Sequence, residues 1–220
     1  MGPILTFDCY GTLLDTRPLY EEVKKIARNH GVDPVQTARL FSSYEDRLMY
    51  GQAYIPYGRL LQEVLQYCDM ELNCNVFSRE YERLLQIHED FMPFDDVIPA
   101  LAHLKQQGYQ LAIMSNTTDE LMKIHVQKLD SLIDDCLTTE QTHCYKPQLD
   151  FFRHAEEKFH LKERDHYHIA KGYWWDMVPA TAMGWNKVWV NRSGLVRGRE
   201  QEHPYEMVHS LDELKLPDPV

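Results

Sequence analysis

Polar residues follow four apolar stretches of this 220-residue chain, and together they have the composition of a nucleophilic site. A carboxylate can attack an electrophilic carbon or phosphorus and form an ester or an acyl phosphate that water then cleaves. A nearby lysine ammonium lowers the pKa of such a carboxylate and keeps it ionised. The four clusters are Asp8 with Thr12, Ser115 with Asn116, Lys146, and Lys171 through Asp176. We therefore expect Asp8 to be the nucleophile and Lys146 to orient it.

These clusters can meet only if the stretches before them are strands of one parallel sheet, because parallel strands present their carboxyl ends at a common edge. The first strand ends at Asp8, and Gly11 permits the turn that follows. Further strands are expected at residues 110–115, 134–138, 166–170 and 187–191, separated by helices near 97–107, 118–129, 148–159 and 176–183. This order predicts an α/β fold with a Rossmann-like parallel sheet, right-handed crossovers and helices on both faces.

The segment from residue 16 to 94 shows helical periodicity without a strand pattern. Pro18 lies near the start of a first helix that stops at Gly31, and Ser78 is the expected N-cap of the last. The helices after the first are expected near 34–50, 57–69 and 78–90. We expect a small inserted helical domain over 16–94 and an α/β core domain made of 1–15 and 95–220. The charged stretch after Gly194 is expected to wrap the core surface, with a short helix around Leu211–Leu214.

The composition argues against several kinds of partner. With 34 acidic and 23 basic residues, the formal net charge is −11, which disfavours a nucleic-acid or anionic-membrane surface. No apolar run approaches the roughly 20 residues of a membrane helix, and the N-terminus lacks the pattern of a signal peptide. We expect a soluble, cytoplasmic protein.

Cysteine and histidine usage suggests neither disulfides nor a metal cluster. The five cysteines are odd in number and form no Cys-x-x-Cys pair, so reduced thiols are expected. Strand alternation turns the thiol of Cys9 away from the face that Asp8 uses, which argues against a thiol nucleophile. His166 and His168 flank Tyr167 in a predicted strand, where packing or surface positions are favoured over metal ligation.

The same strand-end residues carry a resemblance to a known superfamily. The four motifs of the haloacid dehalogenase superfamily resemble Phe-Asp-x-Tyr-Gly-Thr-Leu at 7–13, apolar-Ser-Asn at 114–116, Tyr-Lys-Pro-x-x-x-x-Phe at 145–152 and Trp-Asp at 175–176. The helical insert resembles the type I cap of that superfamily, so the resemblance spans nearly the whole chain. Within it, the chain is most similar to the L-2-haloacid dehalogenases, which also share a later strand ending in Asn-Arg, here Asn191-Arg192.

Two positions indicate which electrophile is attacked. Phosphatases of this superfamily carry a second Asp two residues after the nucleophile, as general acid for the leaving alcohol, and this chain has Tyr10 there. Five residues before Asp176, where the dehalogenases have a serine and the phosphatases typically an acid, the chain has Lys171. An ammonium there would repel magnesium and could neutralise the carboxylates that magnesium otherwise bridges; the alternative is a solvated loop lysine. We expect no metal and no other cofactor.

The resemblance also implies roles for the remaining residues. Ser115 and the backbone amides of Cys9 and Tyr10 would hold the substrate carboxylate, Asn116 would contact the leaving group, and Asp176 would position the water or Lys146. The expected catalytic residues are Asp8, Thr12, Ser115, Lys146, Lys171 and Asp176. The expected substrate-binding residues are Cys9, Tyr10, Asn116, Tyr173, Trp174 and Trp175, of which the last corresponds to an aromatic residue of the apolar pocket.

Two departures concern the half of the site that activates the electrophile. The cap arginine that assists halide departure in the dehalogenases aligns with Ser42, and Arg39 and Arg47 lie nearby but out of register. A family tyrosine six residues beyond the motif lysine is Phe152.

The leading hypothesis is a metal-independent hydrolase that displaces a leaving group from the saturated C2 of a small carboxylic acid. Its substrates are foremost 2-haloacids, which an ester intermediate converts to 2-hydroxy acids. Three alternatives stay open: the same mechanism with carbon–nitrogen cleavage, as in ring opening of azetidine-2-carboxylate; a phosphatase with a degenerate metal site; and a non-catalytic small-molecule binder. A homodimer formed through the cap is compatible with the resemblance.

Overall fold

The chain forms two compact units in the computed structural model, which describes residues 2–51 and 53–217. One unit comprises Met1–Asp15 with Met92–Val220, and the other comprises Thr16–Phe91. We call them the α/β unit and the helical unit.

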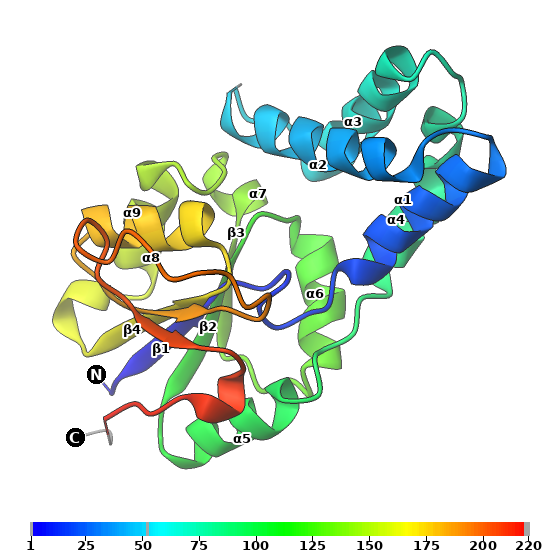
Figure 1. Cartoon of the computed structure of the whole chain (residues 1–220). Helices are drawn as coiled ribbons and strands as arrows, with labels where there is room; N and C mark the ends of the chain where they lie inside the picture. Colours follow the sequence, from blue (N-terminus) through cyan, green and yellow to red (C-terminus); the bar gives the residue numbers. More distant parts are fainter. Residues whose placement is uncertain (1, 52, 218–220) are drawn as a thin grey trace. The chain divides into compact units, whose positions relative to one another are not determined.

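The α/β unit is built on a parallel sheet, which has six strands within the described residues (Figure 1). Their order across the sheet is β3-β2-β1-β4-β5-β6. The strands are β1 (Ile4–Phe7), β2 (Gln110–Ser115), β3 (Asp135–Thr138), β4 (His166–Ala170), β5 (Asn186–Val190) and β6 (Glu206–Val208). The first five lie where the sequence predicts strands, and the predicted parallel α/β fold is confirmed.

Helices cover both faces of this sheet (Figure 1). They are α5 (Val97–Gln106) and α6 (Asp119–Lys128) on one face, and α8 (Leu149–Lys158) and α9 (Val178–Ala182) on the other; α7 (Thr139–Thr142) is a single turn after β3. Alternate residues of a strand face opposite sides, so Ala112 and Met114 of β2 pack with Phe151 and Phe152 of α8 in one buried cluster.

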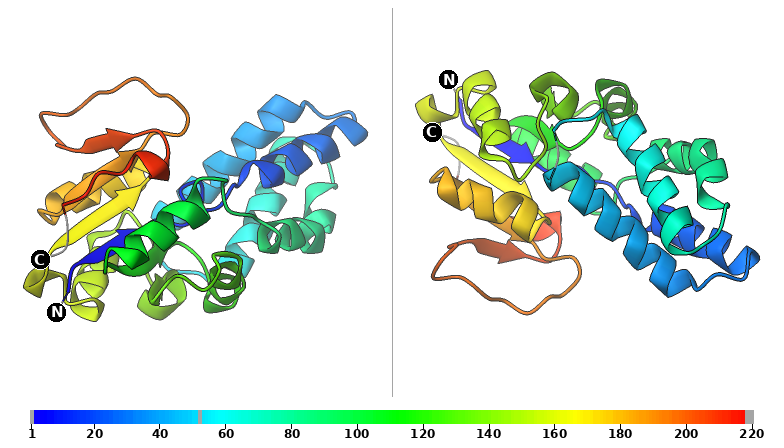
Figure 2. Two further views of the ribbon diagram at one scale, coloured as in Figure 1. Left: turned by 90° about the horizontal axis from the view of Figure 1, so that it is seen from below. Right: turned by 90° about the horizontal axis from the view of Figure 1, so that it is seen from above.

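The strand β6 is an element that the sequence pattern does not predict. It has three residues, one of them Glu206, and none of its side chains is fully buried. It is a strand because β5 offers it an edge, with Val188 opposite Glu206 and Val190 opposite Val208. Both views of Figure 2 show the loop between β5 and β6 extending from this edge. The stretch after Gly194 thus enlarges the sheet, and the short helix expected near its end is the 3₁₀ turn η4 (Leu211–Glu213).

The helical unit contains only helices and turns within its described residues. They are α1 (Arg17–Asn29), α2 (Pro34–Tyr50), α3 (Tyr57–Glu71), the 3₁₀ turn η1 (Phe77–Glu80) and α4 (Tyr81–Glu89). Ser78 does not cap the last helix, because its hydroxyl donates to Oδ2 of the buried Asp69 (2.6 Å), which also accepts from three backbone amides of this turn. In residues 2–51 and 53–217, no helix combines the length and the apolar character that a membrane span requires.

Candidate active site

Strand register brings the predicted clusters to one edge of the sheet. Phe7 pairs with Ile113 of β2 and with Ile169 of β4. The next amide, that of Asp8, still donates to the carbonyl of Ile169 (3.1 Å). Asp8 therefore lies at the same edge of the sheet as Ser115, the last residue of β2, and Lys171, the first residue after β4.

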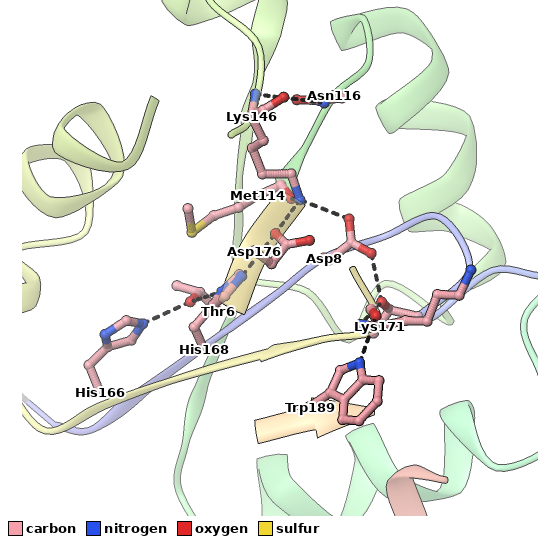
Figure 3. A network of polar contacts seen from close by, with 11 residues as sticks. Thr6, Asp8, Met114, Asn116, Lys146, His166, His168, Lys171, Asp176 and Trp189 are labelled. Atoms are coloured by element: carbon pink, nitrogen blue, oxygen red, sulfur yellow. Dashed lines mark hydrogen bonds and ion pairs between the residues drawn. The ribbon is translucent and has the colours of Figure 1, made fainter. Parts of the chain in front are cut away.

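Both oxygens of the Asp8 carboxylate accept a hydrogen bond. Lys146 Nζ donates to Oδ1 (2.8 Å), as Figure 3 shows, and the Thr12 hydroxyl donates to Oδ2 (2.6 Å). The Thr12 oxygen in turn accepts from the backbone amide of Lys171 (2.8 Å), which ties the loop after β1 to the loop after β4. Gly11 has φ +78°, and a side chain there would meet Lys171 Cδ at 3.3 Å, so the turn requires glycine.

The ammonium of Lys146 lies between two carboxylates (Figure 3). It donates to Asp8 Oδ1 (2.8 Å), to Asp176 Oδ1 (2.7 Å) and to the carbonyl of Met114 (3.0 Å), and the residue is only 2% exposed. The amide of Asn116 accepts from the backbone N–H of Lys146 (2.8 Å) and donates to its carbonyl (3.1 Å). Asn116, expected at the leaving group, therefore holds the backbone from which Lys146 extends.

Burial and charge act in opposite directions on these groups. Burial raises the pKa of Asp8 above its usual value, and although Lys146 lowers it, the negative charge of Asp176 raises it further. The charge of Lys146 alone predicts a lowered pKa for Asp8. The net pKa is instead raised, because the loss of water around the carboxylate outweighs the attraction of the ammonium. For Asp176 burial also raises the pKa, but Lys146 and His168 outweigh it and the net pKa is lowered. Burial lowers the pKa of Lys146, yet the two carboxylates raise it overall, so the ammonium stays charged.

The structure adds His168, which the sequence analysis treats as a packing or surface residue. Its Nε2 lies 3.1 Å from Asp176 Oδ1, and its Nδ1 lies 2.9 Å from the Thr6 hydroxyl, which also contacts His166 Nε2 at 2.8 Å (Figure 3). The spacing of His166 and His168 indicates that both side chains lie on one face of the strand. Only the register with β1 shows that Thr6 faces them. Among the described residues, no group of three or more His, Cys, Asp or Glu side chains is placed to hold a metal ion.

Lys171 contributes its backbone, and not its ammonium, to the contacts around Asp8. Its amide donates to Thr12, its carbonyl accepts from Trp189 Nε1 (3.0 Å), and its exposed side chain lies over Gly11. In the described part of the chain it forms no ion pair with either carboxylate. The sequence predicts that Lys171 could neutralise the two carboxylates. In the structure, the ammonium that lies between them is that of Lys146.

Asp176 is delivered by a π-helical turn, η3 (Tyr173–Met177), and α9 starts only after it. The expected single helix over 176–183 is therefore wrong at its start. The amides of Asp176 and Met177 both donate to the carbonyl of Gly172 (2.9 and 3.3 Å). A side chain on Gly172 would place its Cβ 2.4 Å from Asp176 Oδ2, so any larger residue would displace the carboxylate or the turn.

The three aromatic residues of this turn point to different surroundings. Tyr173 packs edge-on against Trp189 and Tyr205, and its hydroxyl donates to the carbonyl of Gly198 (3.2 Å). It therefore fixes the loop that follows β5. Trp174 is 45% exposed and meets Trp175 edge-to-face, with ring centroids 4.9 Å apart.

The residues next to Asp8 are held rather than free to act as acids. The Tyr10 hydroxyl lies 2.8 Å from Thr117 Oγ1 and 3.1 Å from His125 Nδ1, and burial raises its pKa well above the usual value. The thiol of Cys9 is buried, and burial followed by the charge of Asp8 raises its pKa well above normal. Both groups therefore stay protonated near neutral pH.

Ser115 carries a polar atom with an unmet hydrogen-bonding capacity. Its hydroxyl oxygen is buried and has no hydrogen-bond partner within the described residues. Buried polar groups usually have partners, so this hydroxyl at the end of β2 can still take part in a hydrogen bond.

In the helical unit, both arginines near the expected cap position are exposed. The guanidinium of Arg47 lies 5.1 Å from the centre of the Tyr44 ring, and Arg39 lines a surface pocket with Asp33 and Ser43.

Comparison with known proteins gives the family. A family model described as a haloacid dehalogenase-like hydrolase matches residues 4–184. The chain therefore belongs to the haloacid dehalogenase-like hydrolases, and it is a hydrolase.

The individual relatives have low sequence identity to this chain. (S)-2-haloacid dehalogenase 4A of Burkholderia cepacia is 27% identical, over 94% of this chain and 91% of its own. Haloacetate dehalogenase H-2 of Moraxella sp. (strain B) is 28% identical, over 86% of each chain. A crystal structure of an L-2-haloacid dehalogenase matches with a TM-score of 0.84 at 20% identity and covers 96% of both chains, which shows a common fold.

Proposed function

We propose that this protein hydrolyses small 2-haloacids to 2-hydroxy acids, with Asp8 as the nucleophile and without a metal ion. The observation that carries the proposal is the buried ammonium of Lys146 between Asp8 and Asp176, at 2.8 and 2.7 Å. The names of the two relatives above support haloacids as the substrate class.

In the first step, an oxygen of Asp8 would attack C2 of the substrate from the side opposite the halogen. The new carbon–oxygen bond forms as the carbon–halogen bond breaks, and the halide leaves with the bonding electron pair. Lys146 and Thr12 hold both carboxylate oxygens, so the nucleophile is oriented before the substrate arrives. The product of this step is an ester between Asp8 and C2.

In the second step, water would attack the carbonyl carbon of the Asp8 ester. The bond between that carbon and the ester oxygen on C2 breaks. One proton of the water passes to that oxygen and the other is released, so the 2-hydroxy acid departs and the carboxylate is regenerated. Asp176 is ionised beside Lys146, so it is suited to accept a hydrogen bond from the water.

The substrate carboxylate would bind at the buried hydroxyl of Ser115, which lacks a partner in the described residues. The backbone amides after Asp8 would complete that site. The exposed ammonium of Lys171 adds positive charge over Gly11, which favours an anionic substrate.

The donor set around Asp8 does not suit magnesium. Magnesium requires several oxygen ligands in octahedral geometry, whereas here both oxygens of Asp8 accept hydrogen bonds, from Lys146 and Thr12, and Oδ1 of Asp176 accepts from Lys146. The fourth strand-end loop also begins with Lys171 where the superfamily's phosphatases typically have an acid. No step above uses a metal.

A second candidate is cleavage of a carbon–nitrogen bond by the same route. It is favoured by Ser42 in the place of the halide arginine, and by the engagement of Arg47 with the Tyr44 ring. An amine leaving group, such as the ring nitrogen of azetidine-2-carboxylate, does not need that arginine.

The test is incubation with 2-chloropropionate and with azetidine-2-carboxylate in the presence of EDTA, with Asp8→Asn as control. Chloride release supports the haloacid reaction, 2-hydroxy-4-aminobutyrate supports the amine variant, and a strict magnesium requirement contradicts both. A single turnover in ¹⁸O-water should label Asp8, because water attacks the ester carbonyl. Magnesium-dependent hydrolysis of p-nitrophenyl phosphate would instead indicate a phosphatase, and binding without turnover a non-catalytic protein.

A further inference from the structure

A chain of buried side chains extends the site beyond Asp176. The hydroxyl of Thr6 lies 2.8 Å from His166 Nε2 and 2.9 Å from His168 Nδ1, and His168 Nε2 lies 3.1 Å from Asp176 Oδ1 (Figure 3). Thr6 is opposite His168 in the β1–β4 register, and alternation places His166 on the same face. The rings pack against Trp185, with centroids 4.7 and 6.0 Å away, so these contacts belong to the core.

The proton positions in this chain follow from what each group can donate. An ionised carboxylate only accepts, so Nε2 of His168 carries a proton that it donates to Asp176, whatever the charge of the ring. Burial lowers the pKa of His166 to about 3, which keeps that ring neutral. A neutral His168 accepts the single Thr6 proton at Nδ1, and Thr6 then accepts from His166 Nε2–H. Each hydrogen bond of the chain has one donor and one acceptor.

Two donors from different elements converge on a single oxygen of Asp176. Lys146 Nζ donates to Oδ1 at 2.7 Å, and His168 Nε2 donates to the same atom at 3.1 Å. Within the described residues no donor reaches Oδ2, which lies against Gly172. Lys146 fixes the position of the carboxylate, and His168 fixes its rotation about the Cβ–Cγ bond.

We propose that His168 is a positioning residue that holds Asp176 with Oδ1 on Lys146 and Oδ2 available to the hydrolytic water. The inference rests on the function proposed above and concerns its second step. Without the second donor, the carboxylate would rotate about its Cβ–Cγ bond, and water would lose its oriented acceptor. Attack by Asp8 on C2 depends on Lys146 and Thr12 and is much less affected.

The first test compares ester formation with ester hydrolysis in three variants. His168→Leu removes the donor, His168→Gln returns an amide N–H near the position of Nε2, and His154→Leu is the same change at an exposed histidine. In His168→Leu, kcat and KM should fall together by roughly 10- to 100-fold, as loss of a hydrogen bond to a charged group predicts, while kcat/KM is retained. The Asp8 ester should accumulate in the intact-protein mass spectrum, and His168→Gln should restore part of kcat.

A merely structural role gives a different result. Loss of kcat/KM in proportion to kcat without accumulated ester, or an unchanged kcat in His168→Leu, would overturn the proposal. His154→Leu should match the wild type in every constant.

The second test needs no substrate and uses the wild-type protein with ¹⁵N-labelled histidine. The His168 signals, assigned by their loss in His168→Gln, should show a protonated Nε2 and should shift in Asp176→Asn. A bare Nε2 with the proton on Nδ1 alone would overturn the positioning role even in an active enzyme. Absence of halide release from any 2-haloacid, with Nε2 protonated, would overturn the proposed function and not the placement of Asp176 by His168.

Discussion

Lys146 Nζ lies 2.8 Å from Asp8 Oδ1, and the two side chains are 2% and 11% exposed. An ion pair so deeply buried costs desolvation that only close contact and further hydrogen bonds offset. Here Asp176, Thr12 and the carbonyl of Met114 supply those bonds. The arrangement offsets part of the cost of burying the charged carboxylate of Asp8.

Replacing the lysine of this pair tests that arrangement. Lys146→Met would leave two buried carboxylates without their cation, and breaking such a pair costs about 3–5 kcal/mol. We expect loss of halide release and a lower free energy of unfolding in urea. Lys162→Met, at a side chain 77% exposed, should change neither. An unfolding free energy equal to that of the wild type would contradict the prediction.

The raised pKa of Asp8 predicts the acid side of the pH profile. Only the ionised carboxylate attacks, so kcat/KM should fall as the pH drops through the pKa of Asp8. Because burial raises that pKa, the fall should begin at a higher pH than an ordinary aspartate would give. The profile of kcat/KM should be measured alongside circular dichroism, which separates titration from unfolding. A fall only below about pH 4, the range of an unperturbed aspartate, would refute the direction.

Gly172 should tolerate no side chain. In Gly172→Ala the added Cβ would lie 2.4 Å from Asp176 Oδ2, so the carboxylate or the π-helical turn must move. Overpacking of this kind costs about 1–3 kcal/mol. We expect a fall in both melting temperature and kcat. Gly198→Ala, where nothing lies within 4 Å of the added atom, is the matched control.

Arg192 should stabilise the loop that carries Thr12. Its guanidinium donates to the Thr12 carbonyl (3.0 and 2.9 Å) and forms a bidentate pair with Asp96 (3.0 and 2.9 Å). A lysine cannot reproduce this fork. Arg192→Lys should lower the free energy of unfolding by about 1.5–3 kcal/mol, the range for hydrogen bonds to charged groups. Arg153→Lys, on the surface, should be neutral.

Glu45 should make stability depend on pH. Burial raises its pKa to about 7, and the hydroxyls of Tyr57 and Tyr20 donate to it (3.1 and 3.4 Å). Between the unfolded pKa near 4.3 and about 7, the folded state binds more protons, so this group makes stability decrease as the pH rises. Glu45→Gln should therefore melt at a higher temperature than the wild type at pH 8, and Glu82→Gln should not. Equal melting temperatures at pH 8 would contradict the assignment.

Much of the sheet could be predicted from the sequence, because buried strands between helices leave a strong pattern. The five strands from β1 to β5 are marked by apolar runs, and their carboxyl ends carry Asp8, Ser115 and Lys171. Parallel strands bring such ends to one edge whatever their exact register. The short edge strand β6 has no such pattern, since its pairing with β5 decides its conformation.

By itself, the sequence determined which polar residues gather at one edge of the sheet, since that follows from strand order and alternation. Only the tertiary structure decided which side chains touch. Lys146, and not Lys171, lies between the two carboxylates. Asn116 binds the backbone of Lys146, and His168 donates to Asp176. Such contacts depend on strand register, on the direction of each side chain and on the loss of water around it. The spacing of residues along the sequence shows none of these.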